Sequence, residues 1–211
     1  DNTNVHCLML GDDLVALTET NRQSLIDPET LAFRGYVTWR DGFNDLMTLA
    51  HPQYDTRKKL VVTIGSAFGA SPALVALEHS PQGRERREIG RWRMKELPYT
   101  HSFGLTDAHV VLIAHPFTVS PISMLWSNRA FIEHFTWRSQ NGTTLGRMDR
   151  ATGQVHRHTC ESFFVFHTVN AFERSSERLW LVLQHRFVDN TAMRQISRQF
   201  QVGQRIQDGV C

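Results

Sequence analysis

Short apolar runs, separated by small and polar residues, recur along most of the chain. Residues 5–10 and 14–20 form two such runs, and the connection Gly11-Asp12-Asp13 between them is typical of a β-hairpin. Further runs with the same character occupy 60–64, 101–105, 109–114, 143–147, 154–159, 163–166 and 179–183. Repeated hairpins with Gly, Asp and Asn in their turns predict an all-β chain, built as a sandwich, a barrel or a propeller.

Three segments depart from this series of strands. Residues 127–137 place apolar side chains at helical spacing, which predicts a short amphipathic helix. The Gly-Ser-Ala-Phe-Gly stretch at 65–69 predicts a turn after the run that precedes it. The segment 84–88 reads Arg-Glu-Arg-Arg-Glu, and alternating charges of this kind predict a solvated surface loop.

Composition narrows the classes of function. The 211 residues suit one large domain or two small ones, and 23 Lys and Arg stand against 21 Asp and Glu. No basic stripe points to a nucleic-acid partner, so we expect none. No apolar run approaches the roughly 20 residues of a membrane helix, and no signal-peptide pattern opens the chain. Because the chain starts at Asp1 in mid-pattern, we expect the natural N-terminus to lie upstream.

The three cysteines, Cys7, Cys160 and Cys211, form an odd number at spacings that match neither a zinc site nor a disulfide framework. We interpret them as free thiols in a reducing compartment. This interpretation favours a cytoplasmic location.

Three of the 11 histidines, His51, His101 and His167, stand at the edges of apolar runs beside small or turn-forming residues. Pro52 predicts a bend after His51, and Gly104 permits a close backbone approach after His101. Neutral imidazoles brought together from distant stretches are the usual nitrogen-only site for a redox-active transition metal. They lie 50 and 66 residues apart, near the roughly 40–50 residues of one propeller blade plus an insertion. This spacing favours successive sheets that each send one ligand to a common axis.

Five motifs in this sequence resemble those of the carotenoid cleavage oxygenase family, and they occur in the family's order between residues 18 and 173. The motifs are Thr18-Glu19-Thr20-Asn21, Asp27-Pro28-Glu29-Thr30-Leu31, Ala50-His51-Pro52, His101-Ser102-Phe103-Gly104-Leu105-Thr106 and Phe166-His167-Thr168-Val169-Asn170-Ala171-Phe172-Glu173. The family includes retinal-forming and apocarotenoid-forming dioxygenases, lignostilbene dioxygenases and the retinoid isomerase of the eye.

The resemblance implies a seven-bladed β-propeller with short helical insertions and a non-haem Fe(2+) held on its axis by four histidines. Matched by motif, His51, His101 and His167 correspond to three of these ligands. Glu19 corresponds to a glutamate that hydrogen-bonds a ligand histidine from behind. A carboxylate in that position fixes the imidazole tautomer and raises its basicity.

Departures from the family pattern limit what the resemblance covers. Nothing after His167 resembles the Gly-rich motif of the fourth histidine, since His185 stands in a different context. Ala114 and Leu181 occupy places where many members carry an acidic residue. Because the family's chains are more than twice as long, we expect 1–211 to be the central portion of one propeller domain, with N- and C-terminal blades absent. The segment 191–211 is polar and lacks a strand pattern, which is typical of disorder.

The leading hypothesis is an iron-dependent dioxygenase that cleaves a conjugated C=C bond of a carotenoid, apocarotenoid or stilbene-like substrate with O₂ to give carbonyl products. Two alternatives stay open: a degenerate, non-catalytic propeller, and a retinoid isomerohydrolase that uses the same iron without incorporating O₂. A lipophilic polyene substrate implies peripheral contact with a membrane in the full-length protein. Residues 117–126 are the one apolar candidate for that contact, and we assign them instead to the core or to a tunnel lining.

Overall fold

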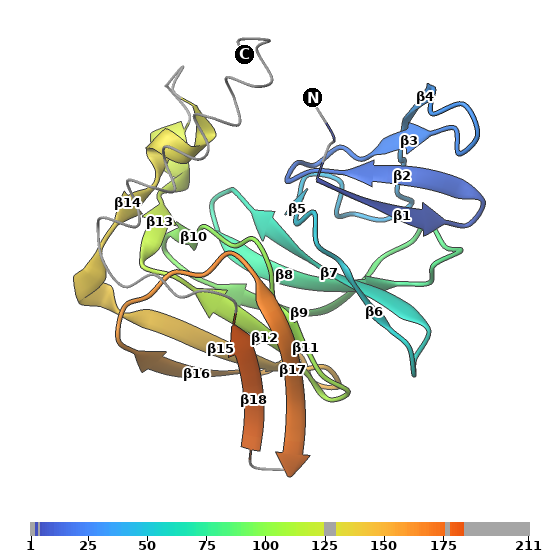
Figure 1. Cartoon of the computed structure of the whole chain (residues 1–211). Helices are drawn as coiled ribbons and strands as arrows, with labels where there is room; N and C mark the ends of the chain where they lie inside the picture. Colours follow the sequence, from blue (N-terminus) through green and yellow to red (C-terminus); the bar gives the residue numbers. More distant parts are fainter. Residues whose placement is uncertain (1–2, 4, 125–129, 176–177, 184–211) are drawn as a thin grey trace.

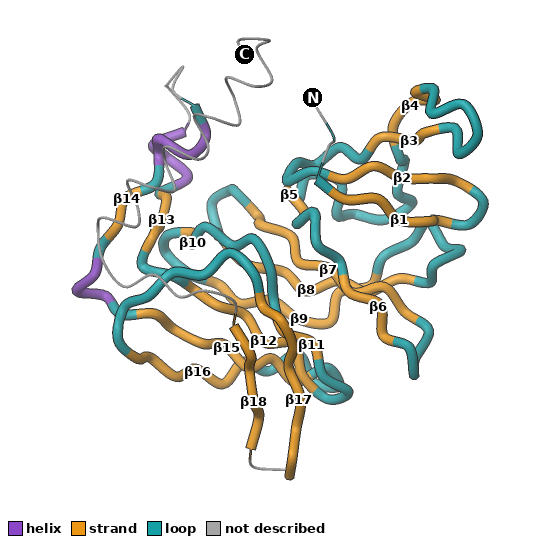
Figure 2. The backbone as a smooth tube through the Cα atoms, viewed as in Figure 1, coloured by secondary structure: helices purple, strands orange, loops and turns teal. Residues whose placement is uncertain are grey.

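The computed structural model describes residues 3, 5–124, 130–175 and 178–183. Over these residues the chain forms a series of antiparallel sheets joined by loops and short 3-10 helices (Figures 1 and 2). The predicted disordered tail at 191–211 lies outside the described residues, as does Cys211. Cys7 and Cys160 are free thiols.

The sheets are built mainly from strands that follow one another along the chain, so hairpin connections dominate the topology. The first sheet has the order β1 (His6–Leu10), β2 (Asp13–Leu17), β3 (Ser24–Ile26), β4 (Phe33–Tyr36). The second has the order β5 (Met47–Thr48), β7 (Leu60–Ala67), β8 (Ala73–His79), β9 (Arg87–Arg93), and β6 (Gln53–Asp55) also pairs with β7.

The remaining strands form one large and two small sheets. A four-stranded sheet has the order β11 (Gly104–Leu105), β12 (His109–Ala114), β15 (Thr143–Asp149), β16 (Val155–Cys160). The smaller ones are β10 (Leu97–Pro98), β13 (Phe117–Val119), β14 (Thr136–Trp137), and the pair β17 (Thr168–Ser175), β18 (Arg178–Leu183). Figure 1 shows β1–β4 on one side of the sheet that contains β7 and β8, and the sheet of β11, β12, β15 and β16 on its other side, with the β17–β18 pair beside β11.

Most predicted runs contain strands. The first hairpin is confirmed as β1 and β2, and Gly11 in its turn has a φ of 63°, a conformation that favours glycine. The predicted turn at 65–69 is wrong in part, because β7 continues through Ala67 and pairs with β8. The predicted strand at 163–166 is reduced to a single β-bridge at Phe164 within a connection, and Phe163, Phe164 and Val165 are buried there.

The predicted amphipathic helix at 127–137 is also wrong over its described part. Residues Phe131–His134 form the 3-10 helix η2, and β14 follows it at once. Among the described residues there are also η1 (Pro121–Met124) and η3 (Ser139–Asn141), and each of these short helices is about one turn.

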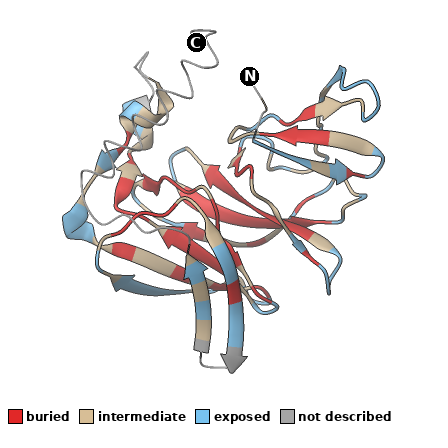
Figure 3. Cartoon of the chain, viewed as in Figure 1, coloured by how far each residue is buried: buried red, intermediate tan, exposed pale blue. Residues whose placement is uncertain are grey.

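The largest hydrophobic cluster lies between the second sheet and the four-stranded sheet that follows it (Figure 3). Ile64 and Leu74 enter it from the second sheet, and Leu112 and Met148 enter it from the other; all four are fully buried. Each side chain of this kind contributes roughly 1.5–3 kcal/mol when it leaves water. This shared core holds the two sheets, and the strands at their inner ends, in a fixed relation.

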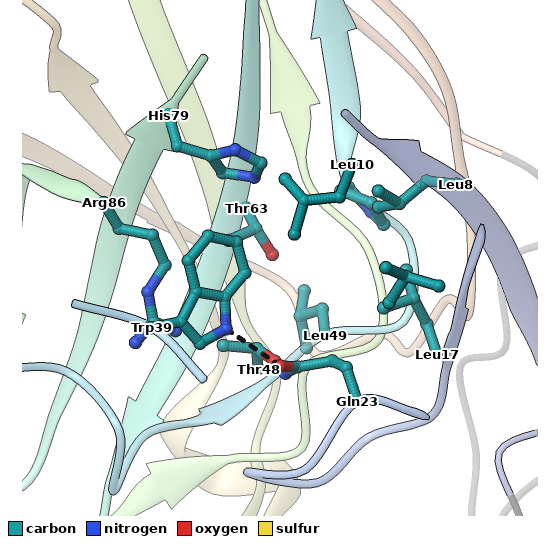
Figure 4. A pocket seen from close by; sticks show the side chains of 12 residues that line it. Leu8, Leu10, Leu17, Gln23, Trp39, Thr48, Leu49, Thr63, His79 and Arg86 are labelled. Carbon is teal, nitrogen blue, oxygen red and sulfur yellow. Dashed lines mark hydrogen bonds between the residues drawn. The ribbon is translucent and has the colours of Figure 1, made fainter. Parts of the chain in front are cut away.

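A second junction joins the first and second sheets, and it corrects the prediction for 84–88. Arg86 is 4% exposed and lies over the Trp39 ring (Figure 4). It also makes a two-point ion pair with Asp41. Trp39 in turn donates its Nε1 hydrogen to Gln23 at 3.0 Å. The pattern of alternating charges predicts a solvated loop. In an extended segment, however, successive side chains point to opposite sides, and the side that carries Arg86 faces the buried carboxylate of Asp41.

A buried arginine ties the second sheet to the next one. Arg150, in the turn after β15, pairs with Asp55 at the end of β6 at 2.6 Å, and both side chains are nearly inaccessible. The same Arg150 Nη1 donates to the Thr106 carbonyl, just after β11, at 3.0 Å. Because a buried charge left alone costs about 3–5 kcal/mol, this ion pair constrains the ends of β6 and β11.

The described part of the apolar segment 117–126, residues 117–124, divides between core and surface, and residues 125 and 126 lie outside the described residues. Phe117 and Val119 are buried, as the assignment to core predicts, whereas Ile122 in η1 is 73% exposed. Within the described residues, no helix combines the length and apolar character needed to cross a membrane.

His115 predicts an acid sensitivity of folding. Burial lowers its pKa to about 4 from 6.5, and its Nδ1 faces the Phe163 carbonyl at 3.1 Å. Between pH 6.5 and 4, His115 therefore binds a proton in the unfolded chain but not in the folded chain. The contribution of neutral, buried His115 to the free energy of unfolding is present above pH 6.5 and is lost as the pH falls toward 4. Replacing His115→Asn keeps a donor for Phe163 and removes the titration. We expect urea unfolding of the whole protein to show that the free energy of unfolding falls between pH 7.5 and pH 4.5. This fall should be about 2–3 kcal/mol smaller for H115N than for the natural sequence.

The control is His156→Asn on β16, where the side chain is exposed. Equal acid losses for H115N and the natural sequence would contradict this account of His115.

Candidate metal centre

Three sheets each present one histidine at the start of their inner strand. His51 stands two residues before β6, His101 three residues before β11, and His167 directly before β17. Inner strands that begin at the same end of their sheets bring these positions together, although 50 and 66 residues separate them. The prediction that successive sheets send these residues to one place agrees with the structure.

The three imidazoles converge through their Nε2 atoms. The His51 and His101 Nε2 atoms lie 2.9 Å apart, and the His101 and His167 Nε2 atoms lie 3.2 Å apart. The ligand atoms of the three residues all lie within 4.8 Å of one another. Two nitrogens bound to one ion at right angles, each about 2.1 Å away, are about 3.0 Å apart. The donor set and spacing therefore fit a transition-metal ion.

The surroundings of His51 favour a neutral ring. Burial lowers the pKa of His51 to about 4, the nearby His101 and His167 add to the shift, and Glu19 opposes it in part. At neutral pH His51 therefore carries no charge and keeps a nitrogen lone pair. A neutral imidazole is the form that binds a metal.

Glu19 lies directly behind His101, as the sequence predicts for an orienting partner. Glu19 stands in the loop after β2, and its Oε1 is 2.5 Å from His101 Nδ1. A carboxylate in this position accepts the Nδ1 hydrogen, so the neutral ring carries its lone pair on Nε2, toward the other two histidines. The ligand roles of the three histidines and the bracing role of Glu19 are taken up below as proposals.

Tyr99 completes this bracing and was not predicted from the sequence. Its hydroxyl donates to Glu19 Oε2 at 3.1 Å, and its ring lies nearly parallel to His101. Burial, with the Glu19 charge and hydrogen bond, raises the pKa of Tyr99 well above its usual value, so the hydroxyl stays protonated as a donor. The signal in the sequence is its spacing: in an extended segment, residues two apart face the same side.

Aromatic rings cover one side of the cluster. Phe166 lies 5.6 Å from His101 between ring centroids and also contacts Tyr99 and Phe164. The other two phenylalanines of the histidine motifs lie elsewhere: Phe103 is fully buried core, and Phe172 is exposed and stacks on Trp180.

Gly104 explains how β17 approaches so closely. A Cβ atom at this position would lie 2.7 Å from a Leu181 methyl and 2.9 Å from the Ala171 Cβ. Any larger residue would push β17 and β18 away from β11, and His167 with them. The predicted close backbone approach at Gly104 is confirmed.

Glu173, at the far end of the third histidine motif, joins β17 to β12. Its Oε1 accepts hydrogen bonds from Thr106 at 2.5 Å and from His109 at 2.8 Å. His109 is therefore a partner in a contact between sheets. Phe172 and Glu173 lie well along β17 from His167, so neither belongs to the histidine cluster.

Comparison with known proteins identifies the family of this chain. Residues 1–207 match the family model described as retinal pigment epithelial membrane protein. The mitochondrial carotenoid-cleaving dioxygenase of Macaca fascicularis is 30% identical over 189 residues, which cover 82% of this chain and 34% of that protein. The chloroplastic carotenoid cleavage dioxygenase 8 homolog A of Oryza sativa subsp. japonica is 31% identical, over 87% of this chain and 34% of that protein. The chain thus spans about a third of the length of these curated relatives.

Solved structures show the same fold. A Synechocystis apocarotenoid oxygenase mutant matches with a TM-score of 0.71 at 22% identity, covering 90% of this chain and 42% of that one. Cobalt-substituted enzyme from the same source matches with a TM-score of 0.70 at 24% identity, covering 85% and 38%. The prediction of an all-β chain that forms part of a propeller, with short helical insertions, is confirmed.

Replacing Glu19→Gln tests the bracing of His101. The amide keeps the shape but loses the charge that holds the Nδ1 hydrogen, and loss of such a partner typically lowers metal affinity 10- to 100-fold. We expect anaerobic Fe(II) titration of the whole protein to show a weakening in that range. Glu85→Gln, on an exposed residue, is the matched control; equal affinities for E19Q and E85Q would refute the bracing role.

Proposed function

Since the chain belongs to the retinal pigment epithelial membrane protein family, we propose that it carries most of the metal site of a non-haem Fe(II) dioxygenase. The enzyme cleaves a conjugated C=C bond of a carotenoid, apocarotenoid or stilbene-like substrate. One O₂ is consumed for each bond cleaved, and its two oxygen atoms end in two carbonyl products. The observation that carries the proposal is the convergence of three Nε2 atoms in a chain whose relatives are named carotenoid-cleaving dioxygenases.

The type of reaction, rather than the donor set, supports iron over zinc. Imidazole nitrogens suit zinc, copper, iron and nickel alike, so the ligands alone do not select the metal. Zinc has no redox chemistry, whereas the relatives' names describe reactions with O₂. Fe(II) held here would supply the redox chemistry that O₂ needs in order to react with a closed-shell alkene.

The residues of the chain do the positioning. His51, His101 and His167 would hold the ion through Nε2, and Glu19 keeps the His101 hydrogen on Nδ1. Tyr99 donates to the second oxygen of Glu19 and stays protonated, so the carboxylate is held at both oxygens. These imidazoles carry no negative charge, so the net charge of the occupied site is set by the ion and by Glu19.

The aromatic side of the cluster suits a lipophilic substrate. Phe166 and Tyr99 lie beside His101, and pockets for apolar ligands are lined mainly by apolar and aromatic groups. A polyene lying against these rings would exclude water from the site. Cytoplasmic location and peripheral membrane contact stay predictions, and some relatives are named mitochondrial or chloroplastic.

Product analysis on the whole protein tests the proposal. With Fe(II) and ¹⁸O₂, we expect β-carotene, an apocarotenal or resveratrol to give carbonyl products labelled with ¹⁸O, at one O₂ per bond cleaved. His167→Ala should abolish cleavage, because it removes one imidazole of the cluster, while His156→Ala on exposed β16 should not.

Other outcomes identify the alternatives. Isomerisation and hydrolysis of a retinyl ester without O₂ uptake would favour the isomerohydrolase. Absence of bound iron and of turnover on all of these substrates would favour a non-catalytic propeller.

A further inference from the structure

Side-chain hydrogen bonds next to the histidines tie two of the three histidine segments together. Ser102, adjacent to His101, donates its hydroxyl to the Phe166 carbonyl at 2.8 Å and accepts the Thr168 N–H at 2.7 Å. Thr168, adjacent to His167, donates its own hydroxyl to the Phe103 carbonyl at 2.5 Å. Three hydrogen bonds therefore hold the chain around His101 against the chain around His167.

The third segment joins the same point through Gln53. Gln53 lies two residues after His51, and its Nε2 donates to the Phe103 carbonyl that Thr168 also uses. Phe103 is fully buried, and a carbonyl oxygen has two lone pairs, so the two donors use its full capacity. One backbone oxygen thus links residues that lie within two positions of each of the three histidines.

This hydrogen bond matters for His51 because of how β6 is attached to the neighbouring sheet. β6 is three residues long and pairs with β7 of its own sheet, Gln53 opposite Val62. At the far end of β6, Asp55 pairs with Arg150, and Arg150 also donates to the Thr106 carbonyl of the neighbouring sheet. At the near end of β6, beside His51, the tie to the neighbouring sheet is the Gln53 side chain.

We propose that Gln53 is a positioning residue of the metal centre: its hydrogen bond to the Phe103 carbonyl sets the placement of His51 relative to His101 and His167. This inference rests on the proposed function, because it assigns the precision of the metal site to a residue that binds no metal itself. Gln53 also borders the hollow that His6, His51 and His167 line, so its amide lies at the site without being one of the three converging ligands.

Gln53→Met tests the inference, since methionine keeps the length of the side chain and removes the donor. In the whole protein we expect Q53M to weaken Fe(II) and Co(II) binding about 10- to 100-fold, the usual effect of losing a residue that orients a ligand. The visible absorption of the Co(II) form should also change, because the ligand field depends on where His51 lies. The melting temperature of the metal-free protein should match that of the control Gln140→Met, which alters an exposed glutamine in η3.

A double-variant cycle adds a test that a purely structural role would fail. Q53M or Thr168→Val alone leaves the Phe103 carbonyl with one donor, whereas the two together leave a buried carbonyl with none. We therefore expect the loss of metal affinity in the double variant to exceed the product of the two single losses.

The outcomes separate the inference from the function it rests on. Metal affinity and a Co(II) spectrum in Q53M equal to those of the natural sequence would overturn the positioning role and leave the metal site intact. A fall in the metal-free melting temperature that accounts for the whole affinity loss would overturn it too, in favour of a structural role. Failure of the natural protein to bind either metal would overturn both proposals.

Discussion

One constraint governs this structure: three imidazole nitrogens from three sheets must meet at one point. Their Nε2 atoms stand 2.9 and 3.2 Å apart, so a shift of half an ångström in any one sheet would spoil the arrangement. No single loop holds them, because they are 50 and 66 residues apart. The relative placement of whole sheets therefore decides whether a metal site exists.

Several kinds of contact between the sheets together meet this requirement. The fully buried core around Ile64, Leu112 and Met148 sets the coarse relation of two sheets. The Asp55–Arg150 ion pair then locates the ends of two inner strands. Hydrogen bonds to one buried carbonyl, at Phe103, locate the residues next to the histidines. Glu19 finally lies 2.5 Å from His101 Nδ1, on the side of the ring away from the other two histidines. Each kind of contact is shorter in range and more directional than the one before it.

The sequence predicted the parts of this arrangement that depend on local pattern or on a motif. Alternating apolar runs predicted the β1–β2 hairpin, and the resemblance brought His51, His101, His167 and Glu19 forward as one group. Parts that depend on distant partners were missed. Arg86 looks like a surface charge until the fold sets Asp41 against it, and nothing near Gln53 shows that it reaches the Phe103 carbonyl. The run at 163–166 is apolar because it is buried, and burial alone does not distinguish a strand from a packed connection.

The function proposed here is that of a metal-dependent oxygenase, and the metal is its central claim. Anomalous diffraction at the iron K-edge, on crystals of the whole protein prepared with Fe(II), tests it most directly. The account predicts one iron peak about 2.1 Å from the Nε2 atoms of His51, His101 and His167. Iron bound elsewhere, or no iron peak among these three residues, would contradict it.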